Sequence, residues 1–186
     1  MGEKVLLHCC CVVCAGYSIE KLVSLGFQPV LFWYNPNIYP DDEYEKRLNE
    51  LKCYAQKLSL ELIIPEQTHE DWVKFVQGLE NEKEGGARCL KCFEYRLNAA
   101  AKEAKKQNIS KFTTTLTISP HKNSKNIFAE GNKAAEENGV EFLEIDFKKQ
   151  NGFIKTIEIA KRENFYRQKY CGCEYALRMQ NEEAFI

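Results

Sequence analysis

The chain has 186 residues, of which 44% are hydrophobic and 28% are charged, and its formal net charge is −1. These values are ordinary for a globular protein, and the length is enough for one domain with a hydrophobic core. No stretch approaches the ~20 apolar residues of a membrane span, and no basic and apolar signal sequence is found at the N-terminus. We therefore expect a cytoplasmic protein with no membrane partner.

Apolar runs that favour strands alternate with helical segments along the chain. Strands are predicted at residues 4–9, 29–35, 60–66, 111–117 and 141–147. One helix follows the first strand, and further helices are predicted at residues 41–58, 93–106, 123–138 and 152–163. The order βαβαβααβαβαα predicts an α/β fold, namely a three-layer, Rossmann-like domain over residues 1–186 with a parallel sheet of about five strands. In the helix at 41–58, the predicted apolar face consists of Tyr44, Leu48, Leu51, Ala55 and Leu58.

Residues 8–14, with the sequence HCCCVVC, lie where the first strand ends and the first helix begins. In open parallel sheets, ligands bind at the carboxyl ends of the strands, near the point where the strand order reverses. We therefore expect a cysteine-rich site at this edge of the sheet. The positive N-terminus of the helix favours thiolates at Cys11 and Cys14.

The chain has 9 cysteines, an odd number that excludes a scaffold in which every cysteine is paired within the chain. In a reducing compartment, clustered cysteines indicate metal binding or catalysis before they indicate disulfides. Cys9 is expected to point away from its neighbours, because side chains alternate along a strand. Cys53, inside a helical run, is expected to be a small core residue. The remaining cysteines form three groups, which are Cys10, Cys11 and Cys14; Cys89 and Cys92; and Cys171 and Cys173.

Six or seven thiols at one site exceed the four ligands of a tetrahedral zinc ion and the four thiolates of one iron–sulfur cluster. The surplus indicates a cluster together with a second metal or a redox-active pair. Two other hypotheses remain. The Cys11–Cys14 pair is typical of a thiol–disulfide oxidoreductase, although it leaves the other groups unexplained. A non-enzymatic zinc-binding interaction domain is the third hypothesis. An ATP-dependent enzyme is not indicated, because no glycine-rich phosphate loop follows the first strand.

Six segments of the chain resemble the cobalamin-independent epoxyqueuosine reductases, the QueH family. They are LLHCCCVVC (6–14), FWYNPNIYPDDEYEKR (32–47), GLENEKEGGARCLKCFEYRL (78–97), FTTTLTISPHKN (112–123), DFKKQNGF (146–153) and YRQKYCGC (166–173). They cover nearly the whole chain in order. The chain departs mildly from the first motif of the family, because Val12 and Val13 stand where alanine and proline are usual.

The resemblance implies a nucleotide α-hydrolase-like fold without ATP chemistry. It also implies the last step of queuosine synthesis: removal of the epoxide oxygen of epoxyqueuosine in tRNA, with electrons from an unidentified donor. The implied cofactors are a [4Fe-4S] cluster and an additional mononuclear iron. Because C-x-x-C spacing suits adjacent irons, we expect Cys89 and Cys92 to bind the cluster. The candidate metal ligands are Cys10, Cys11, Cys14, Cys89, Cys92, Cys171 and Cys173.

Several polar residues are predicted to follow strand ends near these cysteines. His121 is a candidate proton donor, and Asp146 a candidate acid or metal ligand. Residues 148–178 carry 8 basic and 3 acidic residues among several aromatic ones, which suits an unstacked nucleotide. Candidate contacts to the base or ribose are Asn35, Asn37 and Tyr39. Candidate contacts to tRNA phosphates are Arg88, Lys122, Lys148, Arg167 and Lys169.

Overall fold

The computed structural model of the protein describes residues 2–183. Within this range, the strands are β1 (Glu3–His8), β2 (Phe27–Phe32), β3 (Leu62–Ile63), β4 (Lys111–Thr114) and β5 (Glu141–Phe142). The helices are α1 (Val12–Ser24), α2 (Asp41–Lys57), α3 (His69–Phe75), α4 (Ala87–Lys106), α5 (Ser124–Asn138), α6 (Gly152–Arg162) and α7 (Glu174–Glu183), with a 3-10 helix, η1 (Thr115–Ile118), after β4. The predicted order of strands and α-helices is therefore confirmed.

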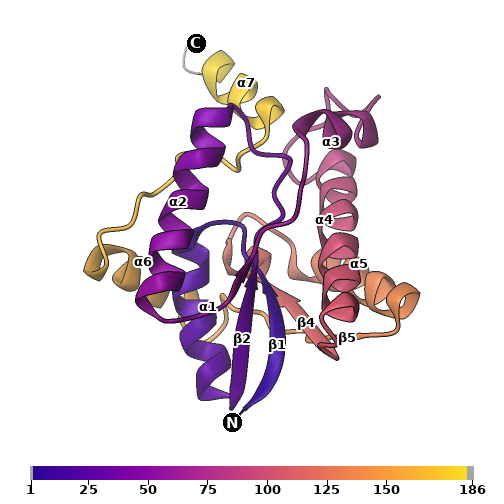
Figure 1. The fold of residues 1–186 in the computed structure, drawn as a ribbon. Helices are drawn as coiled ribbons and strands as arrows, with labels where there is room; N and C mark the ends of the chain where they lie inside the picture. The colour runs from indigo at the N-terminus through magenta and orange to yellow at the C-terminus, as the bar shows by residue number, and fades with distance from the viewer. Residues whose placement is uncertain (1, 184–186) are drawn as a thin grey trace.

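The strands form one parallel sheet in the order β3-β2-β1-β4-β5, and helices cover both of its faces (Figure 1). Helices α1, α2 and α6 pack on one face, where Val5 and Leu7 of β1 are fully buried. Helices α4 and α5 pack on the other face, against Leu6 and Phe32. Neighbouring residues of β1 thus point to opposite layers, as the pleat of a strand requires. The predicted three-layer α/β architecture is confirmed.

Strands β1 and β4 lie side by side, although about a hundred residues separate them in the sequence. The chain turns to β2 on one side of β1 and crosses to β4 on the other, so the strand order reverses between β1 and β4. At the carboxyl ends of the two strands, Nδ1 of His8 is 2.8 Å from Oγ1 of Thr114. In doubly wound sheets, this reversal leaves a crevice at the strand ends in which ligands bind.

The structure corrects several details of the sequence prediction. The strands predicted at 60–66 and 141–147 are shorter, since only Leu62–Ile63 and Glu141–Phe142 are strands. Residues 115–117, which were predicted to continue the fourth strand, form part of η1 instead, because the hydroxyl of Thr114 accepts the backbone N–H of Leu116 and turns the chain. Helix α4 begins at Ala87 rather than at residue 93, so the Cys89–Cys92 pair is helical. Cys53 is exposed and is therefore not a core residue.

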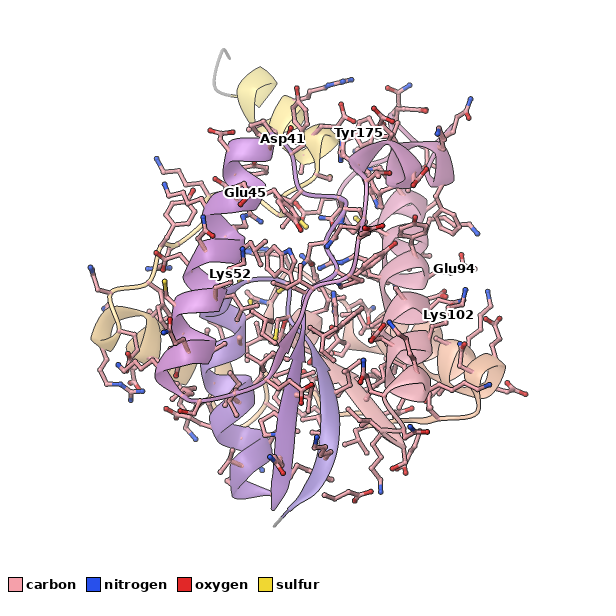
Figure 2. All side chains as sticks on the ribbon, in the orientation of Figure 1. Asp41, Glu45, Lys52, Glu94, Lys102 and Tyr175 are labelled. Carbon is pink, nitrogen blue, oxygen red and sulfur yellow. The ribbon has the colours of Figure 1, made fainter. Side chains whose placement is uncertain are left out.

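Charged side chains lie on the outer sides of the helices, including Glu45 and Lys52 of α2 and Glu94 and Lys102 of α4 (Figure 2). Among residues 2–183, no helix has both the length and the apolar character needed to cross a membrane. Helix α2 buries Leu48, Leu51 and Ala55 of its predicted apolar face, but Leu58 is exposed and Arg47 takes a buried place instead.

Candidate metal centre and substrate cavity

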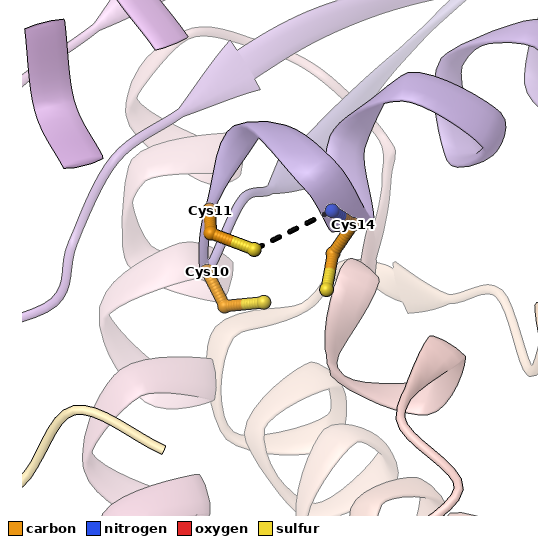
Figure 3. A group of neighbouring side chains, drawn as sticks. All are labelled: Cys10, Cys11 and Cys14. Atoms are coloured by element: carbon orange, nitrogen blue, oxygen red, sulfur yellow. Dashed lines mark hydrogen bonds between the residues drawn. The ribbon is translucent and has the colours of Figure 1, made fainter. Parts of the chain in front are cut away.

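The first group of thiols is assembled by the turn from β1 into α1. Cys10 lies in the loop, Cys11 is the N-cap of α1, and Cys14 is in the first turn of the helix. The sulfur of Cys11 accepts the backbone N–H of Cys14 at 3.4 Å, so the thiol caps the helix. The three sulfur atoms lie within 4.8 Å of one another and point into the same space, an arrangement that can hold a metal ion (Figure 3).

Cys10 is the thiol of this group that ionises most readily. Hydrogen bonds from the Cys11 and Cys14 thiols, together with the Arg96 guanidinium, hold its pKa well below the ordinary value. The hydroxyl of Thr115 also donates to the Cys10 sulfur at 3.2 Å. Hydrogen bonding to Cys10 conversely raises the pKa of Cys11 to about 12. A thiolate at Cys10 is a ready ligand for a soft metal ion.

Cys9 takes no part in this group. Its thiol is fully buried and donates to the carbonyl of Leu7 at 3.3 Å. Burial raises the pKa of Cys9 well above the ordinary value. The expectation that Cys9 points away from its neighbours is therefore confirmed.

The other four thiols meet around a small cavity of about 90 Å³. Cys89 and Cys92 lie at the start of α4, and Cys171 and Cys173 lie in the segment immediately before α7. The backbone N–H of Gly85 donates to the Cys89 sulfur at 3.2 Å. Burial raises the pKa of Cys92, and it raises the pKa of Cys173 to about 12. All nine cysteines, each within the described range, are free.

A larger cavity of about 410 Å³ lies next to the small one. Its lining includes Cys10 and Cys14 together with Cys171, which also lines the small cavity. Side chains from the three cysteine groups, which span residues 10–173, thus meet around two adjoining cavities. The volume of the larger cavity is within the range of small-molecule sites, whereas the small one is below that range.

Arg47 holds the segment that carries Cys171. Its side chain is 2% exposed, and its guanidinium donates to the carbonyls of Cys171 at 3.2 Å and of Tyr170 at 3.3 Å. Gly172 follows with a φ of +123°, and a Cβ there would lie 2.8 Å from Nη1 of Arg47. The turn between Cys171 and Cys173 therefore requires glycine. Sequence reasoning missed Arg47, although its spacing from Leu51 places it on the apolar face of α2.

Arg96 is a second buried cation that the sequence analysis did not identify. It is 3% exposed, lines both cavities and donates to the amide oxygen of Asn35. Asn35 is fully buried and donates its own amide N–H to the carbonyl of Cys9 at 2.9 Å. Both ends of the Asn35 amide thus form hydrogen bonds inside the protein, and Asn35 lines neither cavity.

Replacing Asn35 by alanine is expected to lower the free energy of unfolding by about 2 kcal/mol or more, since a buried guanidinium and a buried carbonyl both lose a partner. Urea unfolding of the purified protein measures this change. Asn132, whose amide contacts Glu144 on the surface, is the matched control, and Asn132→Ala should change the value by less than about 0.5 kcal/mol. Equal stability of the two variants would contradict the anchoring role of Asn35.

The other predicted substrate residues are divided between the interior and the surface. His121 is exposed and lines both cavities, whereas Asn37 is 2% exposed and lines only the small one. Tyr39 is 42% exposed and stacks on His69, with ring centroids 5.4 Å apart, and it lines neither cavity. Asp146 follows β5, also lies outside both linings, and forms an ion pair of 3.6 Å with Lys148.

Three of the predicted phosphate contacts form hydrogen bonds within the protein, namely Arg88, Lys148 and Lys122. Arg88 is 1% exposed and donates to the carbonyls of Leu79, Glu80 and Glu82. The ammonium of Lys148 donates to the carbonyl of Lys122 at 3.0 Å and to the hydroxyl of Ser124.

Lys122 faces the thiols rather than solvent, because its Nζ donates to the Cys171 sulfur at 3.3 Å. Burial opposes its charge, but the neighbouring Cys171 and Cys10 sulfurs and Glu84 raise its pKa above the ordinary value. By contrast, Arg167 and Lys169 are exposed and line the larger cavity. Of the predicted phosphate contacts, these two have exposed side chains.

The polar groups around the small cavity fit an iron–sulfur cluster. Four thiols line it, which is the number of thiolates that one cluster takes. Among the described residues, Nε1 of Trp72, Nε and Nη2 of Arg88 and Nε of Arg96 are buried without a hydrogen-bond partner, and all three side chains line this cavity. Buried N–H groups of this kind can donate to the sulfur atoms of a cluster.

Comparison with solved structures supports the fold. A crystal structure of a predicted subunit of tRNA methyltransferase from Methanocaldococcus jannaschii superimposes with a TM-score of 0.59 at 15% sequence identity. The match covers 84% of this chain and 75% of that chain. At this identity the likeness shows the fold alone, and it agrees with the three-layer α/β architecture described above.

Sequence comparison identifies the family. The family model "Epoxyqueuosine reductase QueH" matches residues 5–179. The epoxyqueuosine reductase QueH of Haemophilus influenzae is 38% identical over 181 residues, which cover 97% of this chain and 74% of that protein. The QueH of Streptococcus pyogenes is 37% identical over 183 residues, covering 95% and 71%. The chain therefore belongs to the QueH family of epoxyqueuosine reductases, which are oxidoreductases.

Proposed function

We propose that the protein reduces the epoxide of epoxyqueuosine in tRNA to the alkene of queuosine, the last step of queuosine synthesis. The observation that carries this proposal is the larger cavity, which is lined by Cys10, Cys14 and Cys171 and also by the exposed Arg167 and Lys169. A modified base can reach the thiols there while its backbone phosphates stay near the two cations. The tRNA substrate and the free thiols both suit a reducing cytoplasm.

We propose that the candidate thiolates together hold a [4Fe-4S] cluster and an additional iron, with Cys89 and Cys92 bound to the cluster. The soft sulfur donors suit both. When bound, these cofactors supply the electrons and a Lewis acid for the epoxide oxygen. The ligands come from β1–α1, α4 and the segment before α7, so residues 1–186 are proposed to act as a single reductase domain.

The overall reaction converts the epoxide, two electrons and two protons into the alkene and water. His121 is the proposed proton donor, since its exposed side chain lines both cavities and an imidazolium nitrogen can protonate the departing oxygen. Lys122, buried beside Cys171, supplies positive charge where thiolates gather. Asp146 stays a candidate acid or ligand. The electron donor is a partner that must reach this face of the protein.

The alternative of a thiol–disulfide oxidoreductase is disfavoured. Such enzymes use a partly exposed cysteine with a lowered pKa in the C-x-x-C motif. Cys11 is only 1% exposed, and hydrogen bonding to Cys10 raises its pKa to about 12. Hydrogen bonding to Cys10 and Cys11, together with burial, also raises the pKa of Cys14 well above its ordinary value. Neither member of the pair therefore has the lowered pKa that is typical of a redox-active cysteine.

Anaerobic purification followed by a visible spectrum and iron and sulfide analysis tests the cofactor proposal. Incubation with tRNA carrying epoxyqueuosine and a strong chemical reductant, with mass spectrometry of the digested nucleosides, tests the reaction. We expect loss of one oxygen from the modified nucleoside. Zinc without sulfide, or an intact epoxide after incubation with iron-loaded protein, would refute the proposal.

Arg167→Ala and Lys169→Ala are each expected to weaken tRNA binding, because both side chains line the open cavity and can neutralise phosphates. Each lost phosphate contact should reduce the slope of log affinity against log salt by up to ~1. Titration of tRNA at several salt concentrations measures both effects. Lys102→Ala, on the outer side of α4, is the control and should leave affinity and slope unchanged (Figure 2). Wild-type slopes in both cavity variants would place the tRNA elsewhere.

A further inference from the structure

One face of α6 forms a wall of the larger cavity. Phe153, Thr156 and Ile157 all line it, at the spacings of three and four residues that bring side chains to the same side of a helix. Helix α6 packs against α1, which carries Cys14, and the approach is close: a Cβ on Gly16 would lie 2.8 Å from Cγ2 of Ile159. This wall is therefore fixed relative to the thiols.

Phe153 contributes an exposed aromatic ring to the lining of the cavity. It is 39% exposed, whereas most large apolar side chains of the protein are buried. The neighbouring Ile154 is 56% exposed but lies outside the cavity lining. An exposed aromatic ring beside basic residues is a platform on which an unstacked nucleic-acid base can lie.

Thr156 places an unused hydroxyl deeper in the same wall. The residue is 1% exposed, and its Oγ1 has no hydrogen-bond partner among the described residues. A buried hydroxyl without a partner is destabilising, and such groups are rare in folded proteins. Because Thr156 lines the cavity, its hydroxyl is a candidate partner for a polar atom of a ligand bound there.

We infer that Phe153 and Thr156 form the nucleoside subsite of the enzyme. Phe153 stacks on the heterocyclic base of the modified nucleotide, and the Thr156 hydroxyl bonds a polar atom of the same nucleoside. With Arg167 and Lys169 on the phosphates, the epoxide ring extends toward Cys10 and Cys14. This inference rests on the proposed tRNA substrate and identifies the residues that select the extruded nucleoside.

The test uses the iron-loaded, full-length protein and tRNA carrying epoxyqueuosine. Phe153→Leu keeps an apolar side chain but removes the ring, and should weaken tRNA binding by roughly 5- to 100-fold. Thr156→Val removes only the hydroxyl and should weaken binding by roughly fivefold or more, while the melting temperature stays unchanged or rises because an unpaired buried group is lost. Ile154→Ala is the matched control on the same helix and should bind like the wild type. Iron content should stay constant in all three variants.

The outcomes separate the subsite from the proposed function. Wild-type affinity in Phe153→Leu or in Thr156→Val, in a protein that still reduces the epoxide, would overturn the role of that residue and leave the proposed function intact. A wild-type protein that neither binds nor reduces the modified tRNA would instead refute the proposed function, and the subsite with it. Weakened binding in both variants, with a wild-type Ile154→Ala, would support the subsite.

Discussion

Replacing Cys89 or Cys92 by alanine is expected to abolish epoxide reduction and to lower the iron and sulfide content of the protein. Both thiols line the small cavity together with Cys171 and Cys173. Loss of one thiolate from a four-thiolate set leaves an iron without its protein ligand, which destabilises the cluster. Iron and sulfide analysis, the visible spectrum and the rate of epoxyqueuosine reduction measure the three consequences.

Cys53→Ala is the matched control for these variants. Cys53 is exposed and lies outside both cavities, so its replacement should leave metal content and activity unchanged. Because Cys92 is buried, a thermal melt of each metal-free variant separates loss of a ligand from loss of the fold. Normal iron content in a folded Cys89→Ala or Cys92→Ala protein would refute the assignment of that cysteine.

His121→Ala is expected to reduce the single-turnover rate by roughly 100-fold or more while tRNA affinity stays near that of the wild type. The reason is that His121 lines both cavities and is the proposed source of a proton for the departing oxygen. Rapid mixing of reduced enzyme with saturating tRNA isolates the chemical step from binding. His121→Gln, which keeps a polar side chain that cannot deliver a proton at neutral pH, should be impaired to a similar extent.

Lys125→Ala serves as the control for His121, because Lys125 is exposed near the same loop and lines neither cavity. Its rate and affinity should match the wild type. A full rate in His121→Ala at saturating tRNA would assign the proton to another group. A loss of tRNA affinity without a change in rate would make His121 a binding residue.

Most of the architecture could be predicted from the sequence alone. Apolar runs of the right length and the order of strands and helices were enough for a three-layer α/β fold, because hydrophobic periodicity is a local property. The rule that binding sites form at the strand ends placed the residues 8–14 correctly. Boundaries were less predictable: α4 begins six residues before the predicted start, because its N-cap is Gly86 and no capping side chain marks the beginning of the helix.

The cysteine groups were identifiable from spacing, whereas their distribution between two cavities was not. The spacing of cysteines within a group can be read directly from the sequence. That residues 10–14 lie near Cys171, however, depends on the crossover from β1 to β4 and on the hydrogen bond by which Arg47 anchors the segment that carries Cys171. The burial of three arginines likewise depends on hydrogen-bond partners that the local sequence does not reveal. Arg47 donates to the carbonyl of Tyr170, Arg88 to the carbonyl of Glu80 in a nearby loop, and Arg96 to the amide oxygen of Asn35.

The chemistry-bearing residue types, the fold class and the family were therefore determined by the sequence itself, because motifs and periodicity are written along the chain. Only the tertiary structure decided which polar residues face the thiols. It turned Asn35, Arg88 and Lys148 inward and left Arg167 and Lys169 on the cavity wall. It also brought Phe153 and Thr156 into that wall. The physical reason is that a side chain's exposure and hydrogen-bond partners are set by packing between elements far apart in sequence, which no local pattern encodes.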